Sequence, residues 1–204
     1  GKGLIPYGVL VAAWSVENYF LGAHTYSGVN SIFIDEYFEV PLYTGSHIVC
    51  KSCYSDYYSD FGWFGSLESI DNTSMFKLYM IENNNLQLEG FPVDVSSTVF
   101  DLPSGWNWIG YTPQIPIGIN EALSNIPSGN AEYIKSQAAY ADYYPGFGWF
   151  GTLEYMDPFT GFQLRLSEAT AFTYNEGDDG VASQGSDHIY SKQTNVFDLN
   201  IHDY

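Results

Sequence analysis

Short stretches of this 204-residue chain alternate between apolar and polar positions, a period that is typical of β-strands with one buried face. The alternation is clearest in Phe197–Ile201, and Phe100–Tyr111 follows it with aromatic residues and Ile109. Val9–Trp14 is instead a continuous apolar run, which we interpret as a buried strand. These patterns predict strands near both ends and in the middle of the chain.

One segment has helical spacing. Within residues 119–126, Ala122, Leu123 and Ile126 fall on one face of a helix, and Pro127 ends the pattern. A single short helix is therefore expected in this chain.

The segments that follow this helix have the character of strands. We expect residues 132–137 to be extended, and Trp149–Glu154 and Gly161–Leu166 to form a hairpin. The sequence therefore predicts a mainly β protein, with antiparallel sheets in a pseudo-repeated arrangement. The short helix gives it only a minor α+β character.

A duplicated phrase organises the chain. DYYSDFGWFGSLE at residues 56–68 returns as DYYPGFGWFGTLE at residues 142–154, and residues 54–80 align with residues 140–166 without a gap, at 14 identical positions. Such agreement indicates a repeated structural unit. We divide the chain into an N-terminal β module with an incomplete repeat copy (1–99), a complete module (100–174), and an acidic linker with a C-terminal strand (175–204).

The aromatic residues of the phrase have two interpretations. Trp63 and Trp149 are expected in the core, because large aromatic side chains dominate core energetics. The alternative is that the aromatic faces are exposed and stack on sugar rings.

The phrases GWNWIGY, ALSNI, YIKSQ and GWFGTLE resemble a tandem repeat of large modular extracellular surface proteins of marine bacteria and microalgae. In that family a Gly-Trp-Asn-Trp strand, an ALSSI-type helix, an IKSQ strand and a GW-GSL hairpin recur. The resemblance covers residues 100–166 and, less completely, residues 54–80, where the Gly-Trp-Asn-Trp strand and the helix have no clear equivalent upstream. It implies a role at the cell surface rather than a reaction.

Acidic residues strongly outnumber basic ones, with 24 Asp and Glu against six Lys and Arg and a formal net charge of −18 at pH 7. Phosphate contacts need a basic footprint, so nucleic acid is excluded as a partner. An anionic membrane surface would repel the same charge, so we expect no membrane partner either.

Cys50 and Cys53 lie in the phrase CKSC. The flanking residues lack the strand–helix context of a redox motif, and the histidines show no zinc-ligand spacing, which leaves a local disulfide or two free thiols. A disulfide would suit an oxidising compartment. Asn72 begins a sequon in a predicted turn, where we expect an N-linked glycan. Together these features indicate an extracellular or cell-surface protein.

No constellation of residues favours an enzyme. Glu68 and Glu154 are the best acid/base pair for glycoside cleavage, but they occupy the same place in the two repeats, and an enzyme rarely needs its general acid twice. We expect no required cofactor. Asp178 and Asp179, in NEGDDG at residues 175–180, are candidate calcium ligands, and a solvated acidic linker explains the same residues.

The C-terminal strand has no partner strand after it. Phe197, Leu199 and Ile201 would expose an apolar row unless the strand pairs within its own chain or with a neighbouring molecule. In the second case identical subunits would add strands head to tail and build a filament, with the sheet edge near Val9–Trp14 as the acceptor. The sequence therefore predicts a non-enzymatic structural subunit of a surface filament or hair. An adhesive or carbohydrate-binding module, with glycans as partners, and an isolated domain of a larger surface protein are the alternatives.

Overall fold

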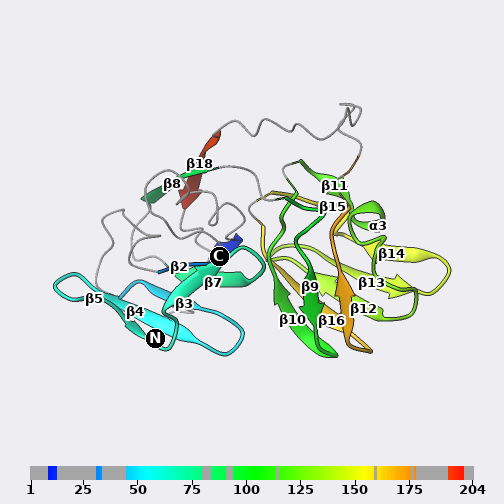
Figure 1. Ribbon diagram of the computed structural model, residues 1–204, viewed down its shortest axis with the longest axis horizontal. Coiled ribbons are helices and arrows are strands. Elements are labelled where there is room, and N and C mark those ends of the chain that lie inside the picture. The colour runs from blue at the N-terminus through cyan, green and yellow to red at the C-terminus, as the bar shows by residue number, and fades with distance from the viewer. Residues whose placement is uncertain are drawn as a thin grey trace, which may run out of the picture.

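The computed structural model describes residues 9–12, 31–33, 45–79, 84–90, 94–113, 115–158, 160–175, 177 and 193–199, with only the backbone for 9–12, 31–33, 84–90 and 193–199. These residues form antiparallel sheets and one short helix, so the predicted mainly β, pseudo-repeated fold is confirmed (Figure 1). Within this part of the chain, no helix has the length and apolar character needed to cross a bilayer.

The first sheet has five strands in the order β1-β7-β3-β4-β5. They are β1 (Val9–Ala12), β3 (His47–Val49), β4 (Tyr54–Tyr58), β5 (Gly62–Gly65) and β7 (Met75–Tyr79). The strand expected in Val9–Trp14 thus forms over Val9–Ala12, at one edge of the sheet.

The second sheet has five strands in the order β10-β16-β12-β13-β14. They are β10 (Gly105–Ile109), β12 (Ala131–Lys135), β13 (Tyr140–Tyr144), β14 (Gly148–Gly151) and β16 (Phe162–Leu166). In Figure 1 the two sheets lie side by side, with β7 of the first sheet toward β10 of the second.

The two sheets also share their register. His47 pairs with Asp56 as Tyr133 pairs with Asp142, each residue 86 positions before its counterpart. This is the spacing of the duplicated phrase, so the sequence repeat is a structural repeat.

The equivalence extends to the first strand of each sheet. Val9 pairs with Leu78 as Asn107 pairs with Leu164, so β1 occupies the position of the Gly-Trp-Asn-Trp strand. The inference that the N-terminal copy lacks this strand is therefore wrong. Backbone pairing with β7 defines the position, and the side-chain sequence of β1 is too different to reveal it.

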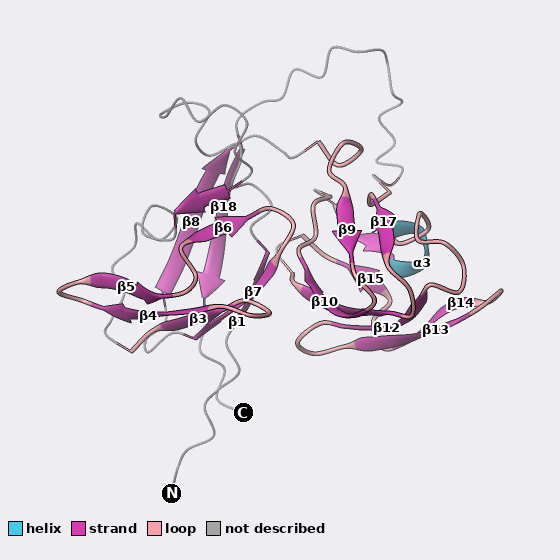
Figure 2. Ribbon diagram, turned by 60° about the horizontal axis from the view of Figure 1, so that its bottom comes forward, coloured by secondary structure: helices cyan, strands magenta, loops and turns pink. Residues whose placement is uncertain are grey.

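Four short ladders accompany the sheets. They pair β2 (Ser31–Phe33) with β6 (Ser69–Asp71), β11 (Ile117–Gly118) with β15 (Tyr155–Met156), β8 (Asn84–Gly90) with β18 (Gln193–Leu199), and β9 (Phe100–Leu102) with β17 (Thr170–Phe172). Figure 2 shows β8–β18 over the first sheet and β9–β17 over the second, on the same side. We call the first sheet with its ladders the N-terminal module, and the second sheet with its ladders and helix the C-terminal module.

The helix α3 spans Ile119–Ala122, which is shorter than the predicted 119–126. After Ala122 the chain continues in tighter turns, because the Ser124 and Ile126 amides donate to carbonyls only three residues before them. Leu123 and Ile126 are nevertheless buried, as the helical pattern required.

Phe100–Tyr111, predicted as one strand, contains two strands in different sheets. Pro103, which cannot donate a backbone hydrogen bond, separates β9 from β10, and Gly105 begins β10 with a φ of 87°. The break lets one segment serve two layers of the module.

The predicted hairpin of Trp149–Glu154 with Gly161–Leu166 is wrong. β14 pairs with β13, and β16 pairs with β10 and β12. A tight turn closed by the Phe147 amide and the Tyr144 carbonyl (2.9 Å) brings GWFG back against the preceding YADYY. The duplicated phrase is therefore itself the hairpin.

The phrase supplies core packing in both modules. Trp63 and Trp149 are 9 % and 6 % exposed, which confirms their predicted core position. Trp149 meets Tyr143 edge-on with ring centroids 5.1 Å apart, and Trp63 meets Tyr57 in the same way at 5.4 Å. A Cβ on Gly151 would lie 2.1 Å from the Tyr140 carbonyl oxygen, so only glycine fits beside the neighbouring strand.

Candidate functional site

Two strands with one sequence occupy one place in the two modules. Val-Phe-Asp-Leu occurs at residues 99–102, ending β9, and at residues 196–199, ending β18. Phe100 pairs with Phe172, and Phe197 pairs with Leu86, which lies 86 positions before Phe172. β18 therefore holds in the N-terminal module the place that β9 holds in the C-terminal module.

The two strands reach these places by different routes. β9 leads directly into β10 of its own module. β18 lies at the opposite end of the chain from β1, the strand that corresponds to β10. The N-terminal module is thus completed by a strand that is distant in sequence, and Figure 2 shows β18 beside β8.

β9 shows what such a strand does in a module. The Phe100 ring is buried and stacks on Phe172 with centroids 5.2 Å apart, and it meets Tyr174 edge-on at 5.1 Å. Tyr174 is also buried and donates its hydroxyl to the Gly110 carbonyl at 3.0 Å. Burial of a phenylalanine contributes about 1.5–3 kcal/mol to the free energy of unfolding. The strand β9 is therefore part of the hydrophobic core and stabilises the module.

Of the predicted assembly residues, Phe197 and Leu199 lie in β18, whose partner within the chain is β8 rather than the edge near Val9–Trp14. Ile201 lies outside the described residues.

The modules meet at the start of β7 and the end of β10. Ser74 forms a β-bridge with Ile109, and the Gly110 amide donates to the Thr73 carbonyl at 2.7 Å. The Met75 side chain fills the space in which a Cβ on Gly161 would stand. Positions 75 and 161 are equivalent in the two modules, so this contact joins the same position of the two repeats.

Two lysines of the N-terminal module reach the Gly-Trp-Asn-Trp strand across this contact. Lys51 Nζ donates to Asn107 Oδ1 at 3.4 Å, and Lys77 Nζ lies 4.8 Å from the centre of the Trp108 ring. Burial, and then the nearby charge of Lys135, lowers the pKa of Lys77. The strand therefore both completes its own sheet and docks on the neighbouring module.

Asn72, the predicted glycosylation site, lies at this contact and is only 1 % exposed. Its backbone carbonyl lies beside Gly110 of the other module. The following residues fold around Asp71, which accepts hydrogen bonds from the Thr73 and Ser74 amides at 2.9 and 2.7 Å. The expectation of an exposed turn is wrong, because the loop packs between modules, and a bulky glycan does not fit on this buried side chain.

Cys50 and Cys53 form a disulfide with a Cα–Cα distance of 5.0 Å. It closes the β3–β4 turn, in which the Cys50 amide donates to the Cys53 carbonyl at 2.9 Å. The equivalent turn of the C-terminal module makes the same bond from Ser136 to Ala139 at 2.8 Å, and the Ser136 hydroxyl accepts from the Ala139 amide. The disulfide thus replaces hydrogen bonds of a serine turn.

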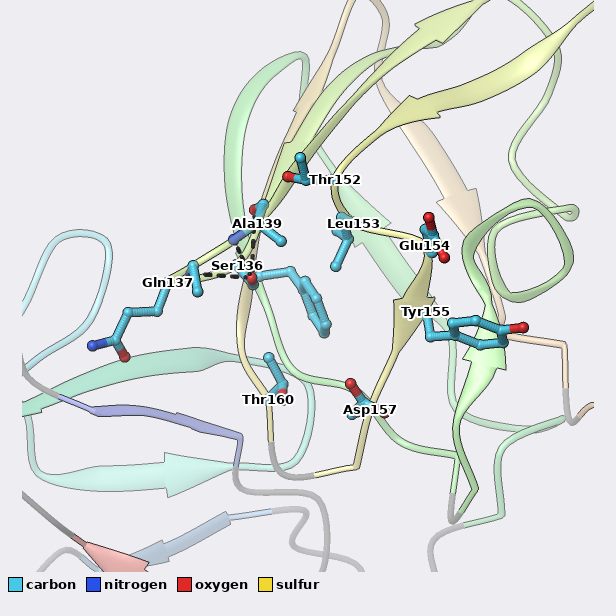
Figure 3. Close-up of a pocket in the computed structure, with 11 residues that line it drawn as sticks. Ser136, Gln137, Ala139, Thr152, Leu153, Glu154, Tyr155, Asp157 and Thr160 are labelled. Atoms are coloured by element: carbon cyan, nitrogen blue, oxygen red, sulfur yellow. Dashed lines mark hydrogen bonds between the residues drawn. The ribbon is translucent and has the colours of Figure 1, made fainter.

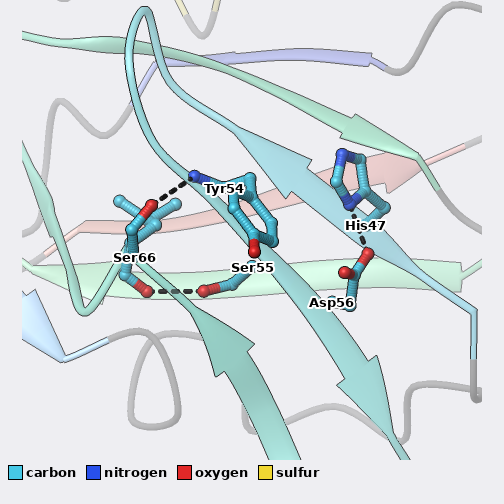
Figure 4. A network of polar contacts seen from close by, with 6 residues as sticks. His47, Tyr54, Ser55, Asp56 and Ser66 are labelled. Carbon is cyan, nitrogen blue, oxygen red and sulfur yellow. Dashed lines mark hydrogen bonds and ion pairs between the residues drawn. The ribbon is translucent and has the colours of Figure 1, made fainter.

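The outer face of each sheet, away from the short ladders, carries polar and aromatic side chains. In the N-terminal module His47 and Asp56 contact each other (Figure 4), with Nδ1 of the histidine 2.5 Å from Oδ1 of the aspartate. The same view shows Ser66 beside β4, where its hydroxyl accepts from the Tyr54 amide at 3.2 Å. The His47–Asp56 pair therefore joins β3 to β4 at the outer surface.

The outer face of the C-terminal module is more aromatic. Trp106 meets Tyr133 edge-on with centroids 5.8 Å apart, and Tyr133 stacks with Tyr140 at 6.0 Å and an interplanar angle of 14°. Lys135 Nζ lies 5.4 Å from the Trp106 ring, and Arg165 Nε lies 2.7 Å from Glu132 Oε2. All of these side chains except Tyr140 line an open groove of about 720 Å³.

A second pocket of about 580 Å³ lies at one end of the same sheet (Figure 3). Ser136 and Ala139 of the β12–β13 turn border it, with Asp157 and Thr160 facing them. Glu154 lines this pocket, whereas Glu68, its partner in the considered acid/base pair, belongs to the other module. Both glutamates are exposed, at equivalent places in the two modules.

Within the described ranges, no three His, Cys, Asp or Glu side chains are grouped so that they could hold a metal ion. Asp178 and Asp179, the predicted calcium ligands, lie outside those ranges.

Comparison with known proteins gives no match to a family model, to a curated protein or to a solved structure.

Sequence reasoning did not single out Trp106, Tyr133, Lys135 and Arg165. One signal was present, because basic residues are so scarce in this chain that their grouping is informative. Their convergence depends on the β10-β16-β12 order, which the local sequence does not encode.

Proposed function

We propose that this chain is a non-enzymatic extracellular structural protein whose identical subunits assemble into a surface filament by exchanging the C-terminal strand. One observation carries the proposal. The Val-Phe-Asp-Leu strand of β18 pairs with β8 in the register in which Val-Phe-Asp-Leu of β9 pairs with β17. The N-terminal module therefore takes a strand of fixed sequence from a distant part of a chain.

A strand supplied in this way can come from the same subunit or from another. The backbone hydrogen bonds and the register are identical in the two cases, which is the condition for strand exchange. Exchange along one direction gives a heterologous contact, and such contacts form open filaments when they do not close. The acceptor is then β8, and the edge of β1 is left for other contacts.

Two further features support an extracellular structural role. The Cys50–Cys53 disulfide suits an oxidising compartment. The packing residues Trp63 and Trp149, and the exposed Glu68 and Glu154, recur once per module, as expected for residues that serve the fold.

The test uses two cysteine variants of the full chain, Thr194→Cys and Glu89→Cys, whose positions face each other across β18 and β8. Each variant alone has one new thiol, so a mixture can form the new disulfide only between subunits. We expect covalent heterodimers in the mixture under assembling conditions, and fibres in electron micrographs. The double variant is the control for pairing geometry. Cross-linking of the double variant within monomers, without heterodimers in the mixture, would show a closed subunit and overturn the proposal.

A further inference from the structure

The groove on the outer face of the C-terminal module has an unusual lining for a chain of this charge. Its walls include three aromatic residues, two acids and two bases: Trp106, Tyr133, Tyr143, Glu132, Asp142, Lys135 and Arg165. The Trp106 side chain is 40 % exposed although it is large and apolar. Binding sites for small molecules combine aromatic side chains with a few polar groups in a concave surface, and this groove has both.

Asp142 and Tyr143 of the groove recur in the N-terminal module as Asp56 and Tyr57, but the groove residues of β10, β12 and β16 are not repeated. The counterparts of Tyr133 and Lys135 in the N-terminal module are His47 and Val49. Arg165 corresponds to Tyr79, paired in the same register. The fold therefore does not require the groove side chains, because the same sheet forms without them.

Two of the charged groups in the groove form a donor and acceptor pair. Arg165 Nε contacts one oxygen of Glu132, and the side chains of this pair are 53 % and 40 % exposed. Their remaining N–H groups and carboxylate oxygen therefore stay available to a ligand. A tyrosine phenol is protonated at neutral pH, so Tyr133 can donate a hydrogen bond to a ligand. Burial, and then the nearby Asp142 carboxylate, raises its pKa further.

We infer that this groove binds a neutral oligosaccharide, with the exposed Trp106 ring stacking on the apolar face of an equatorially linked pyranose ring and with Tyr133 and the Glu132–Arg165 pair binding the sugar hydroxyls. Hydroxyl groups both donate and accept, which matches a lining with equal numbers of acids and bases. An acidic polymer would meet no net positive charge in the groove and a net charge of −18 on the chain.

This activity is separate from filament formation, because the groove residues lie on β10, β12, β13 and β16, whereas strand exchange uses β8 and β18.

The experiment is calorimetric titration of the full chain with β-1,4-linked hexamers of glucose, xylose and mannose, and with an acidic mannuronate hexamer. We expect at least one neutral hexamer to bind, and Trp106→Ala and Tyr133→Ala each to weaken it about 10-fold or more. Phe147→Ala is the control, because this aromatic residue is 80 % exposed on the β13–β14 turn, outside the groove.

A triple variant, Tyr133→His with Lys135→Val and Arg165→Tyr, gives the groove the residues of the N-terminal module. Since the equivalent sheet already folds with these residues, loss of binding in this variant reports the groove and not the fold. Binding that survives the triple variant, binding of the acidic hexamer alone, self-association through this face, or no binding of any hexamer would overturn the inference.

Discussion

Phe197 of β18 pairs with Leu86 of β8, more than a hundred positions earlier in the chain. In the C-terminal module the same pairing joins β9 and β17, which are the first and last strands of that module along the chain. The N-terminal module is therefore rearranged, with its completing strand supplied from the C-terminal end.

Deletion of residues 193–204 tests this rearrangement by hydrogen exchange. We expect the amides of residues 84–90 to lose protection, because they lose their partner strand, while residues 131–166 keep theirs. Addition of a peptide of residues 193–204 should restore protection. Unchanged protection in the truncated chain would show that β8 does not depend on β18.

Gly151→Ala should destabilise the chain by about 3 kcal/mol, because the new Cβ would overlap the Tyr140 carbonyl and neither backbone can move without breaking the β13–β14 ladder. Gly118→Ala is the matched control, since nothing lies within 4 Å of its Cβ position, and it should cost less than about 1 kcal/mol. Urea unfolding measures both. Equal losses in the two variants would contradict the close approach of the strands.

Replacement of CKSC by the SQAA of the other module should cost about 2 kcal/mol or less. The loop between Cys50 and Cys53 is short, so its closure constrains the unfolded chain little, and the serine turn makes the same backbone bond. Thermal unfolding of this variant should be compared with Cys50→Ala/Cys53→Ala, which has no serine at position 50 to accept the turn hydrogen bond and should be less stable. If the order of the two is reversed, the turns are not equivalent.

Stability should fall above about pH 10. Burial raises the pKa of Tyr174 well above its usual value, and burial together with Asp157 raises that of Tyr111. The unfolded chain loses these protons near pH 10 and the folded chain does not, so stability is complete below that pH. It then declines by at most about 1.4 kcal/mol per pH unit for each tyrosine.

Tyr174→Phe separates this effect from general alkaline damage. It removes the hydrogen bond to Gly110, at a cost of about 1 kcal/mol, but should make the decline above pH 10 shallower. Tyr144→Phe, at an exposed position, should leave the slope unchanged. An identical slope in all three proteins would rule out the buried tyrosines as its cause.

The sequence by itself determined the class of fold and the existence of a repeat. Period-two patterns depend on which neighbours of a residue face the core, and the burial of Trp63 and Trp149 follows from their size and apolar character. These are local properties. Local patterns do not determine the partner of a strand when the strands on both sides of it could pair with it. GWFG at residues 148–151 therefore pairs with the preceding strand, although a hairpin with the following strand was predicted.

Only the tertiary structure decided which distant segments meet. Asn72 has the sequence of an exposed turn and is buried because a second module docks on it. β1 and β18 take the places of β10 and β9 through backbone pairing. The sequence of β1 does not resemble that of β10, whereas β18 repeats the Val-Phe-Asp-Leu sequence that ends β9. The groove at Trp106 and Tyr133 exists because strand order brings residues 27 positions apart into contact, and strand order is a property of the whole sheet.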